Sequence, residues 1–245
     1  LTVSGIVNGK ELIGGICGAV FNETLTNCTS QCELNCNGKS QVGGIAGDDR
    51  GFSTFTNCNN YGTITCGQRS GGILGRSQMG TTLDGCKNYG NVTGNADNIG
   101  GICGSIATTT GGGTITNCEN HGTIESTSKT KIGGIIGSVP TNATEIVTIA
   151  NCINSGYISG DKYIGGIIGH PYNTISISNC LNIGQSNGLT GIGGIVGFNQ
   201  GTATITNSFN AGEITGGGIV GSYEPFDWKS HTLTEECRAD ISEIA

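Results

Sequence analysis

Apolar and polar positions along this chain recur together every 28 to 33 residues, with a shorter last step of 24. A Gly-Gly pair opens each unit, Ile follows the pair in all eight units, and another Gly stands two positions later. The pairs begin at residues 14, 43, 71, 100, 133, 165, 193 and 217. Several columns that keep one period predict a repeat architecture.

Two further runs complete most units. A threonine-rich run ends in Asn and Cys, as in TFTNC from Thr54, and a third run reads NxGxI, as from Asn60. These runs are short, contain many β-branched residues and are separated by Gly and Asn, which is typical of strands and turns. No stretch of the array combines an apolar face at helical period with helix caps. We therefore expect three short strands per unit.

Stacked units predict an all-β fold. One unit cannot bury its apolar face alone, whereas successive coils bury one continuous core. We therefore predict a right-handed parallel β-helix of about eight coils, because parallel crossovers are nearly always right-handed. With coils about 4.8 Å apart, the rod is roughly 40 Å long. A propeller blade needs four strands and about 40 residues, more than these units supply.

The repeats divide the chain into two parts. Residues 1–221 form the β-helix, and residues 222–245 break the pattern and form a C-terminal cap or the start of a linker. Tyr223, Phe226, Trp228 and Leu233 are candidate lid residues over the last coil, with a short helix over 233–243. An open stack needs such a cap, because its last coil exposes strand edges and core.

Individual columns suggest individual roles. The Ile after each Gly-Gly pair points inward and stacks on its copies, and the glycines form corners. The Asn of NxGxI takes left-handed turn positions and forms a hydrogen-bonded ladder. Insertions at 107–113 and 140–146 both follow the Gly-Gly strand and project from a single edge.

Composition excludes several classes of protein. The chain has 46 glycines but 3 prolines, which excludes collagen. A net charge of -7, with 12% charged residues, argues against nucleic acid as a partner and against a basic membrane-binding patch. No apolar run approaches the roughly 20 residues of a membrane span, so no membrane insertion is expected. The chain opens on Leu1 inside a strand, which indicates a part of a larger multidomain protein.

The motif GGI, an apolar residue and Gly, followed by xITNCxNxGxIxG, resembles the GLUG-motif repeat family. The likeness covers residues 13 to about 221. Members occur in bacterial surface and secreted proteins, including large adhesins and regions that flank immunoglobulin A1 peptidases. The resemblance implies a β-solenoid on an exported bacterial protein, extracellular or on the cell surface, with no catalytic residues. This chain departs from the family in placing Cys where Ser or Ala would serve.

Twelve cysteines raise the question of metal sites and disulfides. Spacing of about 30 residues does not match zinc clusters of the CxxC type and predicts a stack of small buried side chains. Cys36 and Cys66 each lie eight residues after a column cysteine, Cys28 and Cys58, and so share a place in neighbouring coils. They form a candidate disulfide, with free thiols as the alternative. Cys17 and Cys103 are three coils apart. The stacked column comprises Cys28, Cys58, Cys86, Cys118, Cys152 and Cys180.

The threonine run suggests an ice-binding surface as a distant alternative. With the central apolar residue inward, both flanking hydroxyls face outward, as in Thr54 and Thr56. Thr82/Asp84 and Thr148/Ala150 interrupt the array. The plainer interpretation is that Thr suits exposed strand positions.

No enzyme signature is visible. Asp48, Asp49 and Arg50 cluster after GGIAG and are expected in a solvated turn, as are Asp161 and Lys162 at another corner. The three histidines are far apart, and no HExxH or repeat calcium loop is present. We therefore predict no catalytic residue, no metal site and no cofactor.

The predicted function is a non-enzymatic adhesin-type binding or stalk module that contacts host glycans or extracellular proteins. Candidate ligand contacts are Thr108, Thr109 and Asn142 in the corner loops and Tyr223 and Trp228 in the tail. The alternative is an accessory or spacer domain of a larger secreted peptidase or glycan-degrading enzyme.

Overall fold

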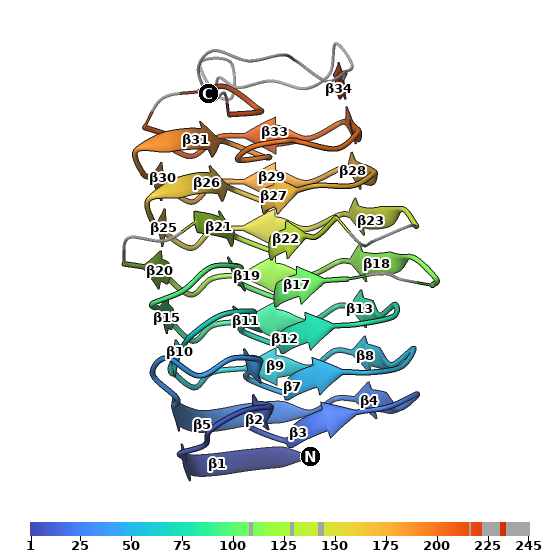
Figure 1. The fold of residues 1–245 in the computed structure, drawn as a ribbon, viewed down its shortest axis with the longest axis vertical. Coiled ribbons are helices and arrows are strands. Elements are labelled where there is room, and N and C mark those ends of the chain that lie inside the picture. The colour runs from blue at the N-terminus through green and yellow to red at the C-terminus, as the bar shows by residue number, and fades with distance from the viewer. Residues whose placement is uncertain (108–109, 128–129, 142–144, 216, 222–230, 234–245) are drawn as a thin grey trace.

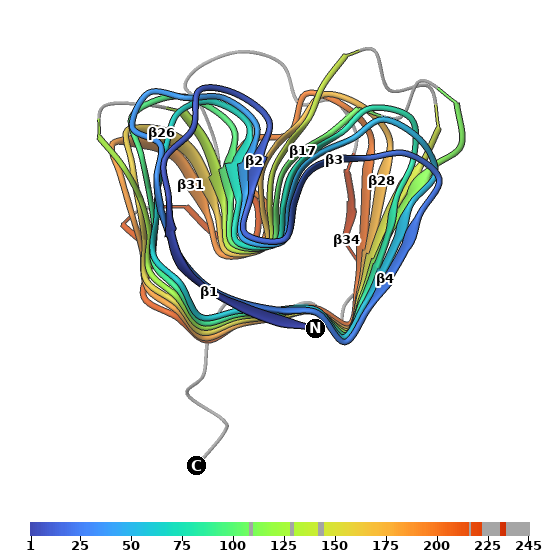
Figure 2. The same cartoon turned by 90° about the horizontal axis from the view of Figure 1, so that it is seen from below.

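The chain winds into a right-handed parallel β-solenoid (Figure 1). The computed structural model describes residues 1–107, 110–127, 130–141, 145–215 and 217–221, and the backbone of 231–233. Seen from the N-terminal end, the chain runs clockwise as it recedes from the viewer, which is the predicted right-handed sense (Figure 2). The strands pair in parallel with their equivalents one coil away, and no helix occurs in the described ranges.

Each complete coil holds up to five short strands, where the sequence predicted three. In the third coil these are β11 (Ser70–Gly71), β12 (Leu74–Ser77), β13 (Thr82–Asp84), β14 (Lys87–Asn88) and β15 (Val92–Gly94). The prediction was wrong because the Gly-Gly and NxG steps are bends that each divide one extended run into two.

Four sheets run the length of the rod. The left-wall sheet comprises β2 (Ile13–Gly14), β6 (Val42–Gly43), β11, β16 (Ile99–Gly100), β21 (Thr130–Gly133), β26 (Lys162–Gly165) and β31 (Thr190–Gly193). The right-wall sheet comprises β3 (Cys17–Val20), β7 (Ala46–Asp49), β12, β17 (Cys103–Ile106), β22 (Ile136–Val139) and β27 (Ile168–Pro171). Each of these two wall sheets adds one strand per coil.

The other two sheets close the coil. The threonine sheet comprises β4 (Thr24–Thr26), β8 (Thr54–Thr56), β13, β18 (Gly113–Thr116), β23 (Val147–Ala150), β28 (Ile175–Ser178), β32 (Ala203–Thr206) and β34 (His231–Leu233). The back sheet comprises β1 (Thr2–Val7), β5 (Thr29–Asn35), β9 (Asn59–Asn60), β10 (Ile64–Cys66), β14, β15, β19 (Glu119–Asn120), β20 (Ile124–Ser126), β24 (Ile153–Asn154), β25 (Ile158–Ser159), β29 (Leu181–Asn182), β30 (Ser186–Asn187) and β33 (Phe209–Asn210).

The rod has about seven turns, one fewer than predicted, since the left-wall sheet has seven strands. The eighth Gly-Gly unit begins another turn, in which Val220 bridges to Val196. β34 adds a strand to the threonine sheet beside β32. The proposed lid side chains and the helix predicted over 233–243 otherwise fall outside the described residues.

The cross-section is indented rather than round. In Figure 2 the Gly-Gly turns dip between the left-wall and right-wall sheets and nearly reach the back sheet. The dip separates two apolar clusters. One contains the Ile after each pair, such as Ile73 and Ile102, and the other contains Ile64, Val92 and Ile99. The expected inward stack of Ile is confirmed, whereas the single continuous core is wrong.

The waist between the two clusters is made of Gly against Asn. A Cβ on Gly101, the second Gly of its pair, would collide with the Gly134 carbonyl and the Asn120 amide. Asn120 is buried and donates to Gly122 O at 3.0 Å and to Asn154 Oδ1 at 2.8 Å. The ladder is confirmed and runs through Asn60, Asn88, Asn120, Asn154, Asn182 and Asn210.

The left-handed turn predicted for the Asn ladder belongs to a different Asn. The Asn before the Cys column adopts φ of 46° to 55° in six coils, which turns the chain from the threonine sheet to the back sheet. Asn tolerates this conformation better than most residues. These residues are Asn27, Asn57, Asn117, Asn151, Asn179 and Asn207, with Gly85 at the same place in the third coil.

Candidate functional site: the front seam

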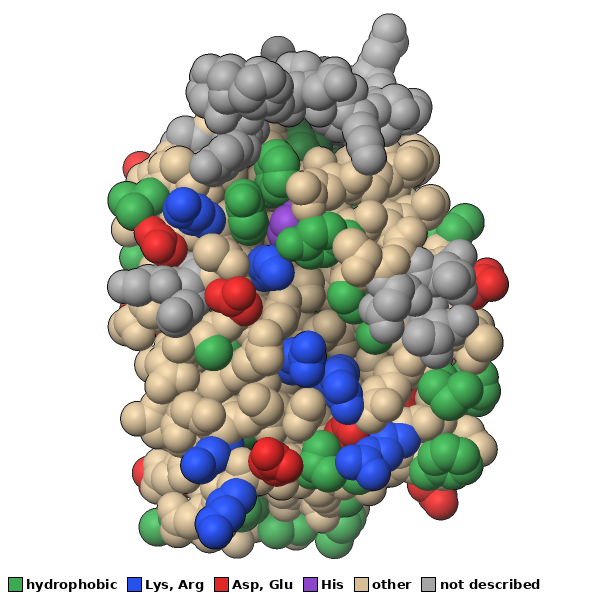
Figure 3. Space-filling view, viewed as in Figure 1, with side chains coloured by type: hydrophobic (Ala, Val, Ile, Leu, Met, Phe, Trp, Pro, Cys, Tyr) green, Lys and Arg blue, Asp and Glu red, His purple; other side chains and the backbone are tan. Residues whose placement is uncertain are grey.

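Two columns of side chains face each other across the dip. We call them the front seam, and each pair is seven residues apart in sequence. The left column is Leu12, Gln41, Arg69, Asn98, Lys131, Tyr163 and Gly191, and the right column is Ala19, Asp48, Arg76, Ser105, Ser138, His170 and Phe198. The seam lies on the face toward the viewer in Figure 3, where Lys and Arg side chains follow the rod with Asp and Glu side chains among them.

Local backbone geometry aims both columns into the seam. Every residue of the left column has φ between 53° and 70°, which turns the chain into the dip. On the right wall, Cys103 and Ile106 both pack in the core, so Gly104 and Ser105 together face the opposite wall. A Cβ on Gly104 would collide with the backbone of Ser70, so the walls meet there backbone to backbone.

Asp48 holds the lower part of the seam together. Its carboxylate is buried and accepts from Arg76 Nε at 2.9 Å, Arg50 Nε at 2.9 Å and Gln78 Nε2 at 2.6 Å. Burial raises the pKa of Asp48, but the hydrogen bonds from Arg76 and Arg50 outweigh it and hold the pKa below its usual range.

The prediction of a solvated turn at Asp48, Asp49 and Arg50 is therefore wrong for both carboxylates, which have no exposed surface. Asp49 accepts from Ser53 Oγ at 2.7 Å and from the Gly51 amide at 3.1 Å, which fixes the turn leaving β7. Burial raises its pKa. Two adjacent carboxylates thus face different surroundings, because β7 directs one to the seam and the other inward.

Arg69 lies opposite Arg76, and no carboxylate of the described residues forms an ion pair with it. Desolvation and the positive charge of Arg76 lower the pKa of Arg69, while Asp48 opposes that shift. Asp48 pairs with Arg50 and Arg76 and forms no ion pair with Arg69. Two half-buried guanidinium groups, those of Arg69 and Arg76, therefore lie beside one carboxylate that also binds the exposed Arg50.

Higher in the seam the side chains become aromatic. Tyr163 lies 4.6 Å from His170 and 4.9 Å from Phe198, measured between ring centroids, and Tyr172 lies 4.0 Å from His170. Lys131 Nζ stands 5.2 Å from the Tyr172 ring centroid. We call Tyr163, His170, Tyr172 and Phe198 the aromatic block.

His170 is the buried centre of the aromatic block, with 1% of its surface exposed. Burial and the nearby charge of Lys131 lower its pKa to about 3, although the Gln200 side chain opposes the shift. Its ring is therefore a neutral imidazole at physiological pH, packed at tilted angles against Tyr163, Tyr172 and Phe198.

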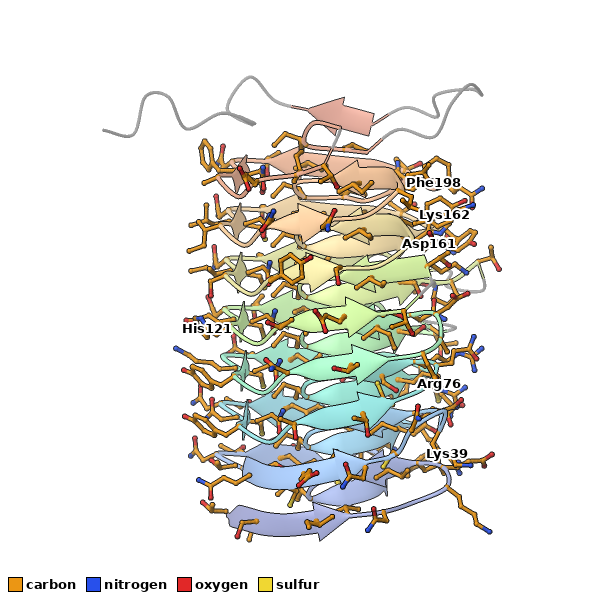
Figure 4. All side chains as sticks on the ribbon, turned by 90° about the vertical axis from the view of Figure 1, so that its left-hand side faces the viewer. Lys39, Arg76, His121, Asp161, Lys162 and Phe198 are labelled. Carbon is orange, nitrogen blue, oxygen red and sulfur yellow. The ribbon has the colours of Figure 1, made fainter. Side chains whose placement is uncertain are left out.

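Basic residues are concentrated on the seam face. Of the 11 Lys and Arg residues, Lys129, Lys229 and Arg238 lie outside the described ranges. Figure 4 shows Lys39, Arg76 and Lys162 along one edge of the rod. Lys10 has the same repeat position as Lys39 and is therefore placed on the seam side as well. Among the described cations, Lys87 alone belongs to the back sheet. The seam face also carries carboxylates, namely Glu11, Asp48, Asp97 and Asp161. Carboxylates on or beside the back and threonine sheets are Glu23, Glu33, Asp84, Glu119, Glu125 and Glu213.

A second aromatic group lies on the opposite side. Tyr61 and Tyr89 stack at 4.7 Å, and Tyr89 and His121 stack at 4.9 Å. Glu119 pairs with Lys87 at 2.9 Å and with His121 at 2.8 Å. We call Tyr61, Tyr89 and His121 the back-face stack, and Figure 4 shows His121 on the edge away from Arg76.

The cysteines are thiols in the described part of the chain. The predicted column is buried, and from Cys58 onward each thiol reaches a carbonyl of the previous coil, as Cys86 Sγ does toward Phe55 O at 3.4 Å. Cys36 and Cys66 lie in neighbouring coils as expected but are also free, so the candidate disulfide is not formed. In the described ranges no three His, Cys, Asp or Glu side chains are grouped to hold a metal ion.

The threonine sheet keeps the predicted register. Thr54, Thr82 and Thr114 pair in successive coils, and the apolar residue between each pair of hydroxyls is turned toward the core. Asp84 interrupts the second column and accepts from Thr116 Oγ1 at 2.7 Å. Within the part of the chain that the structure describes, no helix is long and apolar enough to span a membrane.

The ligand contacts predicted from sequence, Thr108, Thr109, Asn142, Tyr223 and Trp228, all lie outside the described residues. The ends of both insertions do connect the right-wall sheet to the threonine sheet, as expected for loops at one edge. Sequence reasoning missed the seam. The sequence does contain a positional signal for the seam, namely two variable positions at constant spacing. One lies two residues before the first Gly of each Gly-Gly pair, and the other lies five residues after it.

Comparison with known proteins gives no relative. No protein-family description, no curated protein and no solved structure matches this chain.

Proposed function

We propose that this protein is a non-enzymatic binding module of an exported bacterial surface or secreted protein, and that its front seam contacts a host glycan or protein. The observation that supports this proposal most is the position of the side chains that vary from one repeat to the next. The Gly, Ile, Asn and Cys columns form the turns, the core and the ladder. The residues of the two seam columns differ from coil to coil and include Gln, Arg, Lys, Tyr and Phe.

The resemblance of GGI-x-G and TITNC to the GLUG-motif repeats supports export and a place at the cell surface or outside the cell. A stacked solenoid suits that role, because each coil contacts only its neighbours and the array forms an extended surface. Conserved architecture with a variable surface is the arrangement in which repeat proteins carry binding sites.

A spacer role in a larger secreted enzyme is the second candidate. The seam side chains engage one another, with Asp48 between Arg50 and Arg76 and with His170 enclosed by Tyr163 and Tyr172. A seam that is satisfied by its own contacts would serve only to stiffen the rod.

An array of glycans and extracellular-matrix proteins separates these roles when two matched variants are included. Phe198→Ser places in the seam the residue found at Ser138, and Tyr89→Ser places on the back face the residue found at Ser155. We expect saturable binding that falls at least tenfold in Phe198→Ser and persists in Tyr89→Ser. Absence of binding by the wild-type protein, or equal loss in both variants, would contradict the binding role.

A further inference from the structure

We infer that the front seam binds an acidic glycan, with a carboxylate or sulfate group of the polymer held between Arg69 and Arg76. The inference rests on the proposed function and names its ligand class. Three features support it: the guanidinium of Arg69, the spacing of cations and aromatic rings along the rod, and the charges on the seam face.

Arg69 is the group that forms no ion pair among the described residues. It is half-buried, and the charges of Arg76 and Asp48 both act on its pKa. Asp97 adjoins it in the next coil, where the Arg69 amide donates to the Asp97 carbonyl at 3.1 Å. The Asp48 oxygens already accept from Arg76, Arg50 and Gln78. A second anion beside Arg69 and Arg76 would pair with the Arg69 guanidinium. Guanidinium groups match the planar oxygens of carboxylates in a bidentate manner and also bind tetrahedral oxyanions.

The seam continues from this cation pair in the way an extended glycan requires. Each coil advances about 4.8 Å, so the aromatic block begins three coils, or about 14 Å, above Arg69. Between them the seam floor is formed by Asn98, Ser105 and Ser138, which are buried, with Ser138 Oγ donating to Asn98 Oδ1 at 2.7 Å. Lys131 then stands beside Tyr172. An oligosaccharide of several units spans this distance, with an acid group at Arg69, a second contact at Lys131 and a sugar face on Tyr172 or Phe198.

The charge distribution favours an acidic glycan over a polynucleotide. The chain carries a net charge of -7, and most of its described cations lie on one face, where acidic side chains stand among them. A nucleic acid has a phosphate on every nucleotide and selects a dense positive surface. A polysaccharide with one acid group every sugar or two fits widely spaced cations.

The test is a calorimetric titration with four probes, namely a hyaluronan oligosaccharide, chondroitin sulfate, a neutral chitooligosaccharide and single-stranded DNA. Arg69→Gln is the decisive variant, because Gln41 occupies this column with nearly the same φ, 55° against 57°. Arg69 has no ion pair to lose among the described residues, so the variant is expected to unfold at the wild-type urea concentration. Lys87→Gln on the back sheet removes the same charge and is the control.

We expect hyaluronan or chondroitin sulfate to bind at least tenfold more weakly to Arg69→Gln and equally well to Lys87→Gln. Preference for hyaluronan would assign the anion as a carboxylate, and preference for chondroitin sulfate would assign it as a sulfate. Equal weakening by both variants, or tighter binding of DNA, overturns the inference. Binding of the neutral probe alone, insensitive to Arg69→Gln, overturns the inference and leaves the proposed function standing, whereas no binding to any glycan or matrix protein overturns both.

Discussion

The side-chain amide of Asn60 donates to Asn88 Oδ1 at 2.9 Å, although the two residues are 28 positions apart. The same amide donates to Gly62 O at 2.9 Å, so one nitrogen links neighbouring coils and closes its own turn. Both Asn side chains have no exposed surface. The contact repeats along the rod and lies where the Gly-Gly turns meet the back sheet.

Asn60→Ala is expected to destabilise the protein by about 2 to 4 kcal/mol, because it leaves the Gly62 carbonyl and the Asn88 oxygen buried without a donor. Urea unfolding measures the loss. Asn59→Ala is the matched control, since the neighbouring amide reaches only Asn57 O at 3.4 Å near the surface, and it should cost less than about 0.5 kcal/mol. Similar losses for the two variants would show that the ladder does not stabilise the waist.

Gly101→Ala should be more damaging than any other Ala substitution discussed here. The added methyl group would meet the Gly134 carbonyl and the Asn120 amide, neither of which can move without opening the waist. We expect a loss of about 3 kcal/mol or more, seen as a lower Tm and poor soluble yield. Gly218→Ala has no atom within 4 Å of the new methyl group and should leave the Tm nearly unchanged. A soluble Gly101→Ala protein with wild-type Tm would contradict the close approach of the two sheets.

His170 should make the protein less stable in acid. Its folded-state pKa of about 3 lies below the roughly 6.5 of an unfolded chain, so between these values the unfolded chain binds a proton that the folded protein does not. Stability therefore falls as the pH drops from about 6.5 toward 3, by roughly 3 kcal/mol on reaching pH 4.

His170→Phe, which copies Phe198 in the next coil, should remove this part of the acid dependence. Urea midpoints at pH 7 and pH 4 for both proteins measure the difference, and other titrating groups such as Asp49 cancel in the comparison. Parallel pH profiles would show that His170 is charged in the folded state.

The buried thiols should resist alkylation. Burial raises the pKa of Cys66 to about 12, and the thiolate is the reactive form. At pH 8 we expect Cys17, the half-buried thiol among the described cysteines, to react with iodoacetamide before the others. Mass spectrometry of peptides from a Cys237→Ser background identifies the modified positions. Rapid labelling of the Cys28 to Cys180 column in the folded protein would contradict its place in the core.

The same pKa shift has a stability consequence at high pH. Because the folded pKa of Cys66 lies above the unfolded value, its contribution is complete below about pH 9 and is lost as the pH rises toward 12. A urea midpoint that falls between pH 9 and pH 11, and falls less in Cys66→Ser, is the expected result. An unchanged slope in the variant would indicate that another group governs the alkaline limb.

The features formed by repeating residues could be predicted from the sequence, whereas the features formed by variable residues could not. The Ile stack, the Cys column and the Asn ladder follow from columns that recur at one period, because equal positions of stacked coils become neighbours. The dip could not be predicted, since two glycines are equally compatible with an outer corner. The contact of Gly101 with Asn120, 19 positions further along the chain, is what distinguishes an inward dip from an outer corner.

The seam was missed for a related reason. Arg69, Lys131 and Tyr163 share one column but no chemical property, so no residue pattern marks it. Asp48 and Asp49 were placed in solvent because charged residues beside Gly usually are. Their burial depends on Arg76 and Ser53, whose approach is set by the neighbouring coil and the following turn.

The most direct test of the account follows the Arg Nε–H signals by NMR while the strongest ligand from the array is added. Arg50 and Arg76 donate Nε–H to Asp48, and Arg69 does not, so the three signals should be separable. We predict that the Arg69 signal shifts first and most, with smaller changes at Arg76, while His121 ring signals on the back face stay in place. Shifts confined to His121 and its neighbours, with Arg69 unchanged, would contradict the claim that the front seam is the binding surface.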